Sequence, residues 1–238
     1  MRPLVAQLRL ELALVTRNGE SLLLTLGIPV LLLVFFANVD VLPIDGEPID
    51  FLAPGVLALA VLSTSLVNLA IATGFDREHG VLKRLGATPL GRPRLLAAKT
   101  LAVLAVEGVQ IAVLWVIALG LGWDPSPRAG FVLAVALGTT AYAGLGLCLA
   151  GSLKALVTLA AANGLYLVLL LLSGMVIPLE ELPGPVRSVA RALPSGALAE
   201  AVRGSLGSAG HVPGRAWVVL LAWAVAAPVA ATRLFRWE

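Results

Sequence analysis

Charged residues are scarce in this 238-residue chain: only 13% are Asp, Glu, Lys or Arg, whereas 59% are hydrophobic. A typical soluble domain carries about 25% charged residues, and a soluble core of this size could not bury so much apolar surface. The composition therefore excludes an ordinary soluble enzyme, a disordered chain and a basic nucleic-acid-binding domain. It indicates a membrane protein, and the length suits a single transmembrane domain over residues 1–238.

Cysteine and histidine are also rare, with one cysteine, Cys148, and two histidines, His79 and His211. A lone cysteine excludes a disulfide framework and a cysteine-based metal cluster. The sequence contains no zinc motif, no G-x-S-x-G elbow, no Walker A loop and no Rossmann fingerprint. We therefore predict no catalytic residue, no metal site and no cofactor bound by this chain.

Long apolar runs are what the chain has in abundance. A membrane-spanning helix needs about 20 mostly apolar residues, and six stretches qualify. An open sheet in lipid would leave backbone groups unpaired, so we expect an all-α integral membrane fold with six transmembrane helices. The predicted spans are residues 21–39, 51–74, 100–121, 129–151, 156–177 and 216–232.

Basic residues are distributed unevenly between the loops. Lys and Arg accumulate in short cytoplasmic loops, so their distribution predicts orientation. Most of the 17 basic residues fall on the side of the two chain ends, and the first loop on the opposite side, 40–50, has acids but no base. We therefore predict that both termini are cytoplasmic.

The first 20 residues form a predicted amphipathic helix. On a helical wheel one arc is apolar and the arginines lie roughly opposite. The apolar arc consists of Leu4, Val5, Leu8, Leu12 and Val15, and the basic residues are Arg2, Arg9 and Arg17. Such a helix lies in the membrane interface. Either it only sets the topology, or it also contacts a cytoplasmic partner.

Residues 75–90, between the second and third spans, predict a short surface helix. Asp76 and Glu78 precede it and Lys83 and Arg84 end it, an order that complements the helix dipole. The helix also has a small apolar face, which a plain loop would not need. That face consists of Val81, Leu82 and Leu85. The alternative is a solvated run of charges that only sets the topology.

Glycine and proline interrupt the apolar sequence over residues 174–206. The pattern predicts a break near Gly174–Pro178, then a short amphipathic helix, then another helix around Ala197–Leu206. Non-helical backbone at membrane depth is tolerated where it is covered by protein or lines a cavity. We expect this segment to shape an outer gate, with Gly174, Pro178, Glu180 and Pro183 as candidates; the alternative is a loop on the lipid surface.

Several polar residues lie inside the predicted spans. The second span contains Ser63, Thr64, Ser65 and Asn68, and the fifth contains Thr158, Asn163 and Tyr166. Such side chains serve more often as hydrogen bonds between helices than as substrate contacts, and both roles stay open.

One ionisable residue, Glu107, lies well inside the third span. A charge is costly there, so we expect Glu107 to face protein or water, either in an ion pair or hydrogen bond or in a transport role. The fourth span contains Gly138, Gly144, Gly146 and Gly151, which predict close contacts between helices.

Two motifs resemble those of the membrane subunits of ABC-2-type transporters. The first is Arg77-Glu78-His79-Gly80-Val81-Leu82 with Leu85, Thr88-Pro89-Leu90 and Lys99; the second is Ser173-Gly174, Ile177-Pro178, Glu180 and Leu182-Pro183, with Leu193-Pro194 further on. Their order and the arrangement of the predicted spans match the family over nearly the whole chain.

The resemblance implies an exporter permease in a bacterial inner membrane, of the kind that exports drugs, lipids or saccharides and can confer multidrug resistance. It implies a separate ABC ATP-binding subunit, which binds ATP and Mg and hydrolyses the ATP, and a homodimer or paired permease, without nucleic acid. The resemblance also implies that the short surface helix within residues 75–90 is a coupling helix, which docks in a groove of that subunit. The residues that would make this contact are Arg77, Glu78, His79, Gly80, Val81, Leu82, Lys83, Arg84 and Leu85.

Two other classes of function compete with this interpretation. A stand-alone secondary transporter or channel would have repeated halves or charges deep in several spans. A membrane-embedded enzyme would need a cluster of His, Asp or Ser near one interface. The sequence shows neither feature clearly.

Overall fold

The computed structural model describes residues 2–17, 19–38, 47–87, 91–176, 178–207 and 210–235. Within these ranges every regular element is a helix, which confirms the predicted all-α fold. The helices are α1 (Arg2–Arg17), α2 (Gly19–Ala37), α3 (Pro48–Leu62), η1 (Ser63–Asn68), α4 (Leu69–Glu78), α5 (Val81–Gly86), α6 (Arg92–Gly120), α7 (Ala129–Ser152), α8 (Ala155–Leu171), η2 (Leu179–Glu181), α9 (Gly184–Ala192), α10 (Pro194–Leu206) and α11 (Gly214–Leu234).

Four helices in the described residues are long and apolar enough to cross a membrane: Pro48–Glu78, Pro93–Gly120, Ala129–Ser152 and Gly214–Leu234. Two shorter apolar helices, Thr25–Ala37 and Ala155–Leu171, lie where the first and fifth spans were predicted. Each predicted span therefore overlaps an apolar helix, and the number of helices that cross the membrane stays a prediction.

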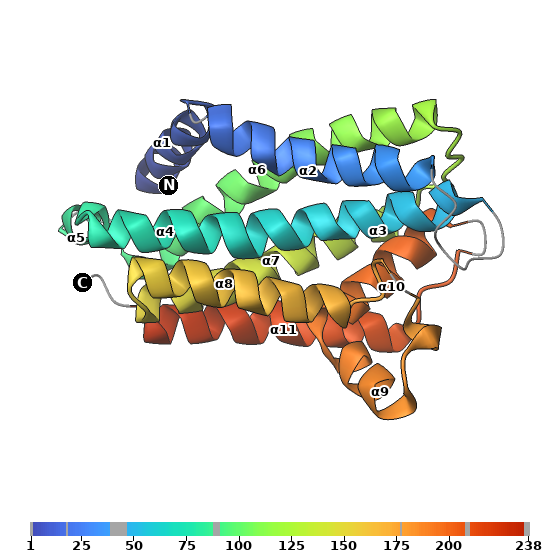
Figure 1. Cartoon of the computed structure of the whole chain (residues 1–238). Coiled ribbons are helices and arrows are strands. Elements are labelled where there is room, and N and C mark those ends of the chain that lie inside the picture. Colours follow the sequence, from blue (N-terminus) through green and yellow to red (C-terminus); the bar gives the residue numbers. More distant parts are fainter. Residues whose placement is uncertain are drawn as a thin grey trace.

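The long helices form an elongated bundle with two different ends (Figure 1). The start of α1, the end of α11 and the short helix α5 lie at one end. We call it the elbow end, after the sharp turn between α4 and α5. The start of α3 and the helices α9 and α10 lie at the opposite end. Both chain ends thus lie at the same end of the bundle as α5, which is the arrangement that the six predicted spans would give.

The centre of the bundle is the continuous helix formed by α3, η1 and α4. Its residues from Leu52 to Leu62 are buried, and it runs between α2 and α8 in Figure 1. The middle segment η1 is a π-helix that begins at Ser63, the first of the polar residues predicted in this span. A π-helix inside an α-helix is rare and is frequent at functional sites.

The largest differences from the predicted boundaries are at three helix ends. The helix of the fifth span ends at Leu171, whereas the span was predicted to continue to residue 177. The third span begins at Arg92, rather than at residue 100, because Gly91 (φ +70°) and Pro93 start the helix before the apolar run begins. The helix of the second span continues to Glu78, so Asp76, Arg77 and Glu78 belong to its last turn. Hydropathy finds the part of a helix inside the bilayer and misses the turns beyond it.

The glycines of α7 lie at the helix contacts that the sequence predicts. A Cβ on Gly144 would lie 2.5 Å from the Pro228 nitrogen, and one on Gly151 would lie 2.8 Å from the Phe235 Cα, both in or next to α11. Gly138 faces the side chain of Leu198 of α10, whose Cδ1 would lie 2.9 Å from a Cβ at this position. The backbones of α7 and α11 therefore pack at a distance that only glycine permits.

Candidate functional site

The elbow consists of the end of α4, the short helix α5 and the turn between them, residues 77–86. The turn itself is tight and lies at His79 and Gly80. The His79 N–H donates to the Phe75 carbonyl (2.9 Å) and the Gly80 N–H donates to the Arg77 carbonyl (3.0 Å). Gly80 has φ +71°, a conformation that a side chain would disfavour, and it lets the chain turn away from the axis of α4. Gly80 thus has a geometric role in the predicted coupling segment.

Leu82 holds α5 against the rest of the membrane domain. Its side chain is 0% exposed and packs in a cluster at the elbow end, with Leu85 at the margin. The other buried members are Leu69, Leu95, Leu96, Ala143, Leu147, Ala231 and Phe235. A buried side chain cannot contact a partner without leaving its own core, so Leu82 positions α5, whereas the sequence suggested an anchor in the partner.

The outer face of the elbow is charged around one apolar side chain. Glu78, His79, Lys83 and Arg84 are exposed, and so is Val81. Arg77 turns inward instead, because its Nη1 donates to the Ala150 carbonyl of α7 (2.9 Å). The nine residues predicted for partner binding therefore divide into an exposed set and a set that fixes the elbow to the bundle.

Lys99 joins three helices just inside the elbow end. Its Nζ lies 2.9 Å from Asp76 Oδ2 of α4 and 3.0 Å from Glu11 Oε1 of α1. The Lys99 side chain is only 2% exposed. A partnership of Lys99 with Glu107 on its own helix is not formed. Neither carboxylate partner could be found from spacing, since Asp76 lies 23 residues and Glu11 88 residues away in the sequence.

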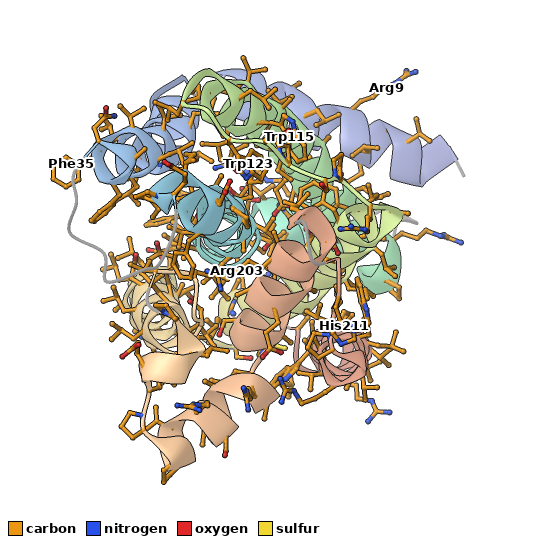
Figure 2. The ribbon with its side chains drawn as sticks, turned by 90° about the vertical axis from the view of Figure 1, so that its right-hand side faces the viewer. Arg9, Phe35, Trp115, Trp123, Arg203 and His211 are labelled. Carbon is orange, nitrogen blue, oxygen red and sulfur yellow. The ribbon has the colours of Figure 1, made fainter. Side chains whose placement is uncertain are left out.

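The helix α1 faces the bundle with polar residues and with half-buried leucines. Gln7 is buried and donates to Glu11 Oε1 (2.8 Å), whereas Val5 is exposed. Leu8 and Leu12 are half-buried, and Arg9 points away from the bundle (Figure 2). The side chains of Leu4 and Val15, also predicted in the apolar stripe, lie outside the described residues.

Polar residues of η1 connect three helices inside the bundle. Thr64 donates to Gln110 of α6 (2.9 Å), and Asn68 donates to Thr25 of α2 (2.8 Å). Gln110 in turn donates to the Thr25 carbonyl (2.7 Å), which closes the network. Ser63 bonds to the Ala60 carbonyl of its own helix (3.1 Å). These contacts fit the interpretation that Thr64 and Asn68 form hydrogen bonds between helices. Their partners Thr25 and Gln110 were not among the residues predicted from the sequence.

The polar residues of α8 lie differently. Asn163 is exposed and donates to the Leu159 carbonyl of its own helix (2.8 Å), while Tyr166 is half-buried. Large apolar side chains on the same helix are also exposed, among them Leu167 and Leu171. This helix therefore presents Asn163 on a surface that the rest of the chain leaves uncovered.

Glu107 is enclosed between α6, α7 and η1. Its side chain is 0% exposed, and Thr139 of α7 donates a hydrogen bond to Oε2. Ser65 of η1 lies beside the carboxyl group. Within the described residues, Oε1 has no hydrogen-bond partner and Glu107 has no ion pair. The hydrogen-bond alternative for Glu107 is the one that this geometry supports.

We expect the Glu107→Gln variant to fold as well as the natural protein, because an ionised carboxylate buried without a counter-charge is costly and an amide has almost the same shape. Glu107→Lys should lower the stability by about 3–5 kcal/mol, because it buries an unpaired charge. Thermal unfolding of the purified proteins in detergent measures both. Equal destabilisation by the two substitutions would contradict this account and indicate a required negative charge.

The predicted outer break is anchored by an arginine from α10. Arg203 Nη2 donates to the Gly174 carbonyl (2.7 Å), and its guanidinium lies 3.9 Å from the centre of the Phe51 ring of α3. Gly174 is buried with φ +71°, and the Met175 carbonyl lies where a Cβ on Gly55 would be. Arg203, visible in the centre of Figure 2, was not among the predicted gate residues.

The other candidates for the outer gate are placed less tightly. Pro178 lies directly before η2, and Pro183 lies directly before α9. Pro183 therefore separates these two short helices. The side chain of Glu180 lies outside the described residues. The predicted second helix of this segment is α10, which begins at Pro194. The break and both helices are thus present, and a gating role stays a prediction.

Comparison with known proteins identifies the family. The family model described as ABC-2 type transporter matches residues 4–206, which is most of the chain. No curated protein matches the chain. The match includes both predicted motifs, the elbow and the outer break. Together with its apolar helices, it makes the chain a multi-pass membrane protein and a transport component. The chain belongs to the ABC-2 type transporter family.

Proposed function

We propose that the chain is the permease subunit of an ATP-driven exporter and that its elbow binds a separate ABC ATP-binding subunit in the cytoplasm. The observation that carries the proposal is the elbow itself. It places exposed charges around Val81 at the same end of the bundle as both chain ends, on a helix whose other face is fixed by Leu82. Family membership supports the association with such a subunit.

The elbow would transmit motion because it is part of the bundle. Val81 would insert into a groove of the partner, and charges such as Glu78 and Arg84 would set the register. A force applied to α5 then acts on Leu82, whose cluster includes residues of α4, α6, α7 and α11. Packed cores move as units, so a shift of the elbow would displace these long helices together.

The substrate pathway would lie between two permease subunits. The exposed face of α8, with Asn163 and the half-buried Tyr166, is the candidate lining. A mostly apolar lining with a few amides and hydroxyls suits a drug-like, lipid-like or saccharide compound that is partly apolar. Thr64 and Asn68 are engaged within the chain, so we assign them to helix packing.

A charge-reversal variant tests the elbow. The permease is co-expressed with candidate ABC ATP-binding subunits and purified through a tag on the permease. Glu78→Arg combined with Arg84→Glu should lower the amount of co-purified subunit by tenfold or more, which corresponds to about 1.4 kcal/mol of binding free energy. Both side chains are exposed, so thermal stability should stay unchanged.

The matched control is Asp124→Lys, an exposed charge beyond the far end of α6. It should leave co-purification unchanged. The proposal fails if no ATP-binding subunit co-purifies with the natural permease, or if the elbow and control variants retain the subunit equally.

A further inference from the structure

The contact of Lys99 with two carboxylates is unusual in its charge balance. One cation, 2% exposed, is shared by Glu11 of α1, 13% exposed, and Asp76 of α4, 29% exposed. A buried ammonium group needs at least one anionic partner, and leaving it without any is strongly destabilising. Either carboxylate alone would meet this need. The second one is therefore free to leave without exposing an unpaired buried charge.

The two carboxylates belong to elements that are held in different ways. Asp76 lies on α4, which is joined to α6 through the apolar cluster that includes Leu69, Leu95 and Leu96. None of the described residues of that cluster comes from α1. The helix α1 instead packs mainly on α6 and faces it with Gln7 and Glu11. An element whose described residues contribute nothing to that buried apolar cluster separates more readily than one that the cluster holds.

Several side chains of α1 that the bundle leaves uncovered suit a position on the membrane. Val5, Leu10 and Leu14 are exposed, as is Arg9, which points away from the bundle in Figure 2. An amphipathic helix with apolar residues and arginine on its free surface binds at the interface of a bilayer. A released α1 would therefore stay at the membrane surface.

We propose that Lys99 is a positioning residue that latches α1 to the elbow, with Asp76 as its permanent partner and Glu11 as its exchangeable partner. In the latched state Lys99 binds both carboxylates, and α1 lies against α6. In the released state Lys99 keeps Asp76 alone, and α1 moves along the membrane surface. The coupling of this release to ATP rests on the proposed function, whereas the latch is a property of this chain alone.

Hydrogen exchange of the full-length protein in lipid nanodiscs tests the latch without a partner. Glu11→Gln should speed amide exchange in α1 roughly tenfold and leave residues 69–86 unchanged. Asp76→Asn should slow exchange in α1, because Lys99 is then no longer shared and pairs with Glu11 alone. Opposite effects of two carboxylate removals are what distinguish a latch from a structural ion cluster, in which both would loosen the fold.

The single variant Lys99→Met would leave two carboxylates without their cation and is not expected to fold. A neutral triple variant, Glu11→Gln, Asp76→Asn and Lys99→Met, removes the latch without this problem. Removing all three charges avoids any unpaired buried charge, so thermal stability should be close to that of the natural protein. Exchange in α1 should nevertheless be fast. The latch is refuted if Asp76→Asn speeds exchange in α1 as much as Glu11→Gln does, or if the stable triple variant keeps α1 protected.

The same variants separate the latch from the proposed function. The ATP-binding subunit and a non-hydrolysable ATP analogue are added to the natural permease and to Asp76→Asn. Faster exchange in α1 of the natural permease, but not of Asp76→Asn, supports control of the latch by ATP. If the subunit does not bind, the proposed function fails while the exchange results without it still decide the latch.

Discussion

Replacing Gly144 with leucine is expected to prevent the protein from folding. The Cβ alone would lie 2.5 Å from the Pro228 nitrogen and 2.6 Å from the Ala227 carbonyl carbon, and these backbone atoms cannot move aside unless α7 and α11 separate. Overpacking costs about 1–3 kcal/mol where side chains can adjust, and more where backbone is in the way. Size-exclusion chromatography after detergent extraction should show aggregate instead of a single folded species.

The matched control is Gly164→Leu, on α8. A Cβ at this position would have no atom within 4 Å, so this variant should fold normally. It adds the same side chain to another membrane helix and differs only in the space around it. If both variants give the same folded species, the close contact of α7 with α11 does not exist in the protein.

The second large effect is expected at Leu82. Leu82→Ala removes a fully buried side chain from the cluster that joins α5 to four other helices, and such a change typically costs about 2–5 kcal/mol. Its neighbour Val81 is exposed, so Val81→Ala should change the stability by less than about 0.5 kcal/mol. Thermal unfolding of the permease alone compares the two.

Binding of the ATP-binding subunit should rank the same two variants differently. Val81→Ala should weaken co-purification of the subunit while the permease stays stable, because Val81 is on the exposed face of the elbow. Leu82→Ala should lower the stability first and affect binding only through the displaced helix. Loss of binding in Leu82→Ala at unchanged stability would show that Leu82 contacts the partner directly.

The sequence predicted the features of this fold that depend on local pattern. Long apolar runs located the helices, and the small residues of the fourth span, such as Gly144, indicated close helix packing. Gly174 and the prolines that follow it marked the outer break. Each of these signals is contained in a short stretch of chain, and each reflects a constraint that the bilayer imposes on any sequence.

The features that the sequence did not show depend on contacts between distant segments. Lys99 was noted as part of the first motif, but nothing in its neighbourhood indicates Glu11 as a partner. The short elbow helix offered too few apolar residues to tell which faces inward, and the structure buries Leu82 while exposing Val81. Glu107 was expected to have a partner, and Thr139 donates a hydrogen bond to it. The sequence could not identify Thr139, because several other hydroxyl residues in the spans could have made the same hydrogen bond.

The central claim, that the exposed face of the elbow binds an ABC ATP-binding subunit, is tested most directly by site-specific photo-cross-linking. A photoreactive amino acid is placed at Val81 in the co-expressed complex, and at Asp124 as the control at the opposite end of the bundle. The account predicts a covalent adduct with the ATP-binding subunit from position 81 and none from position 124. A complex that forms an adduct from position 124, or none from position 81, would contradict it.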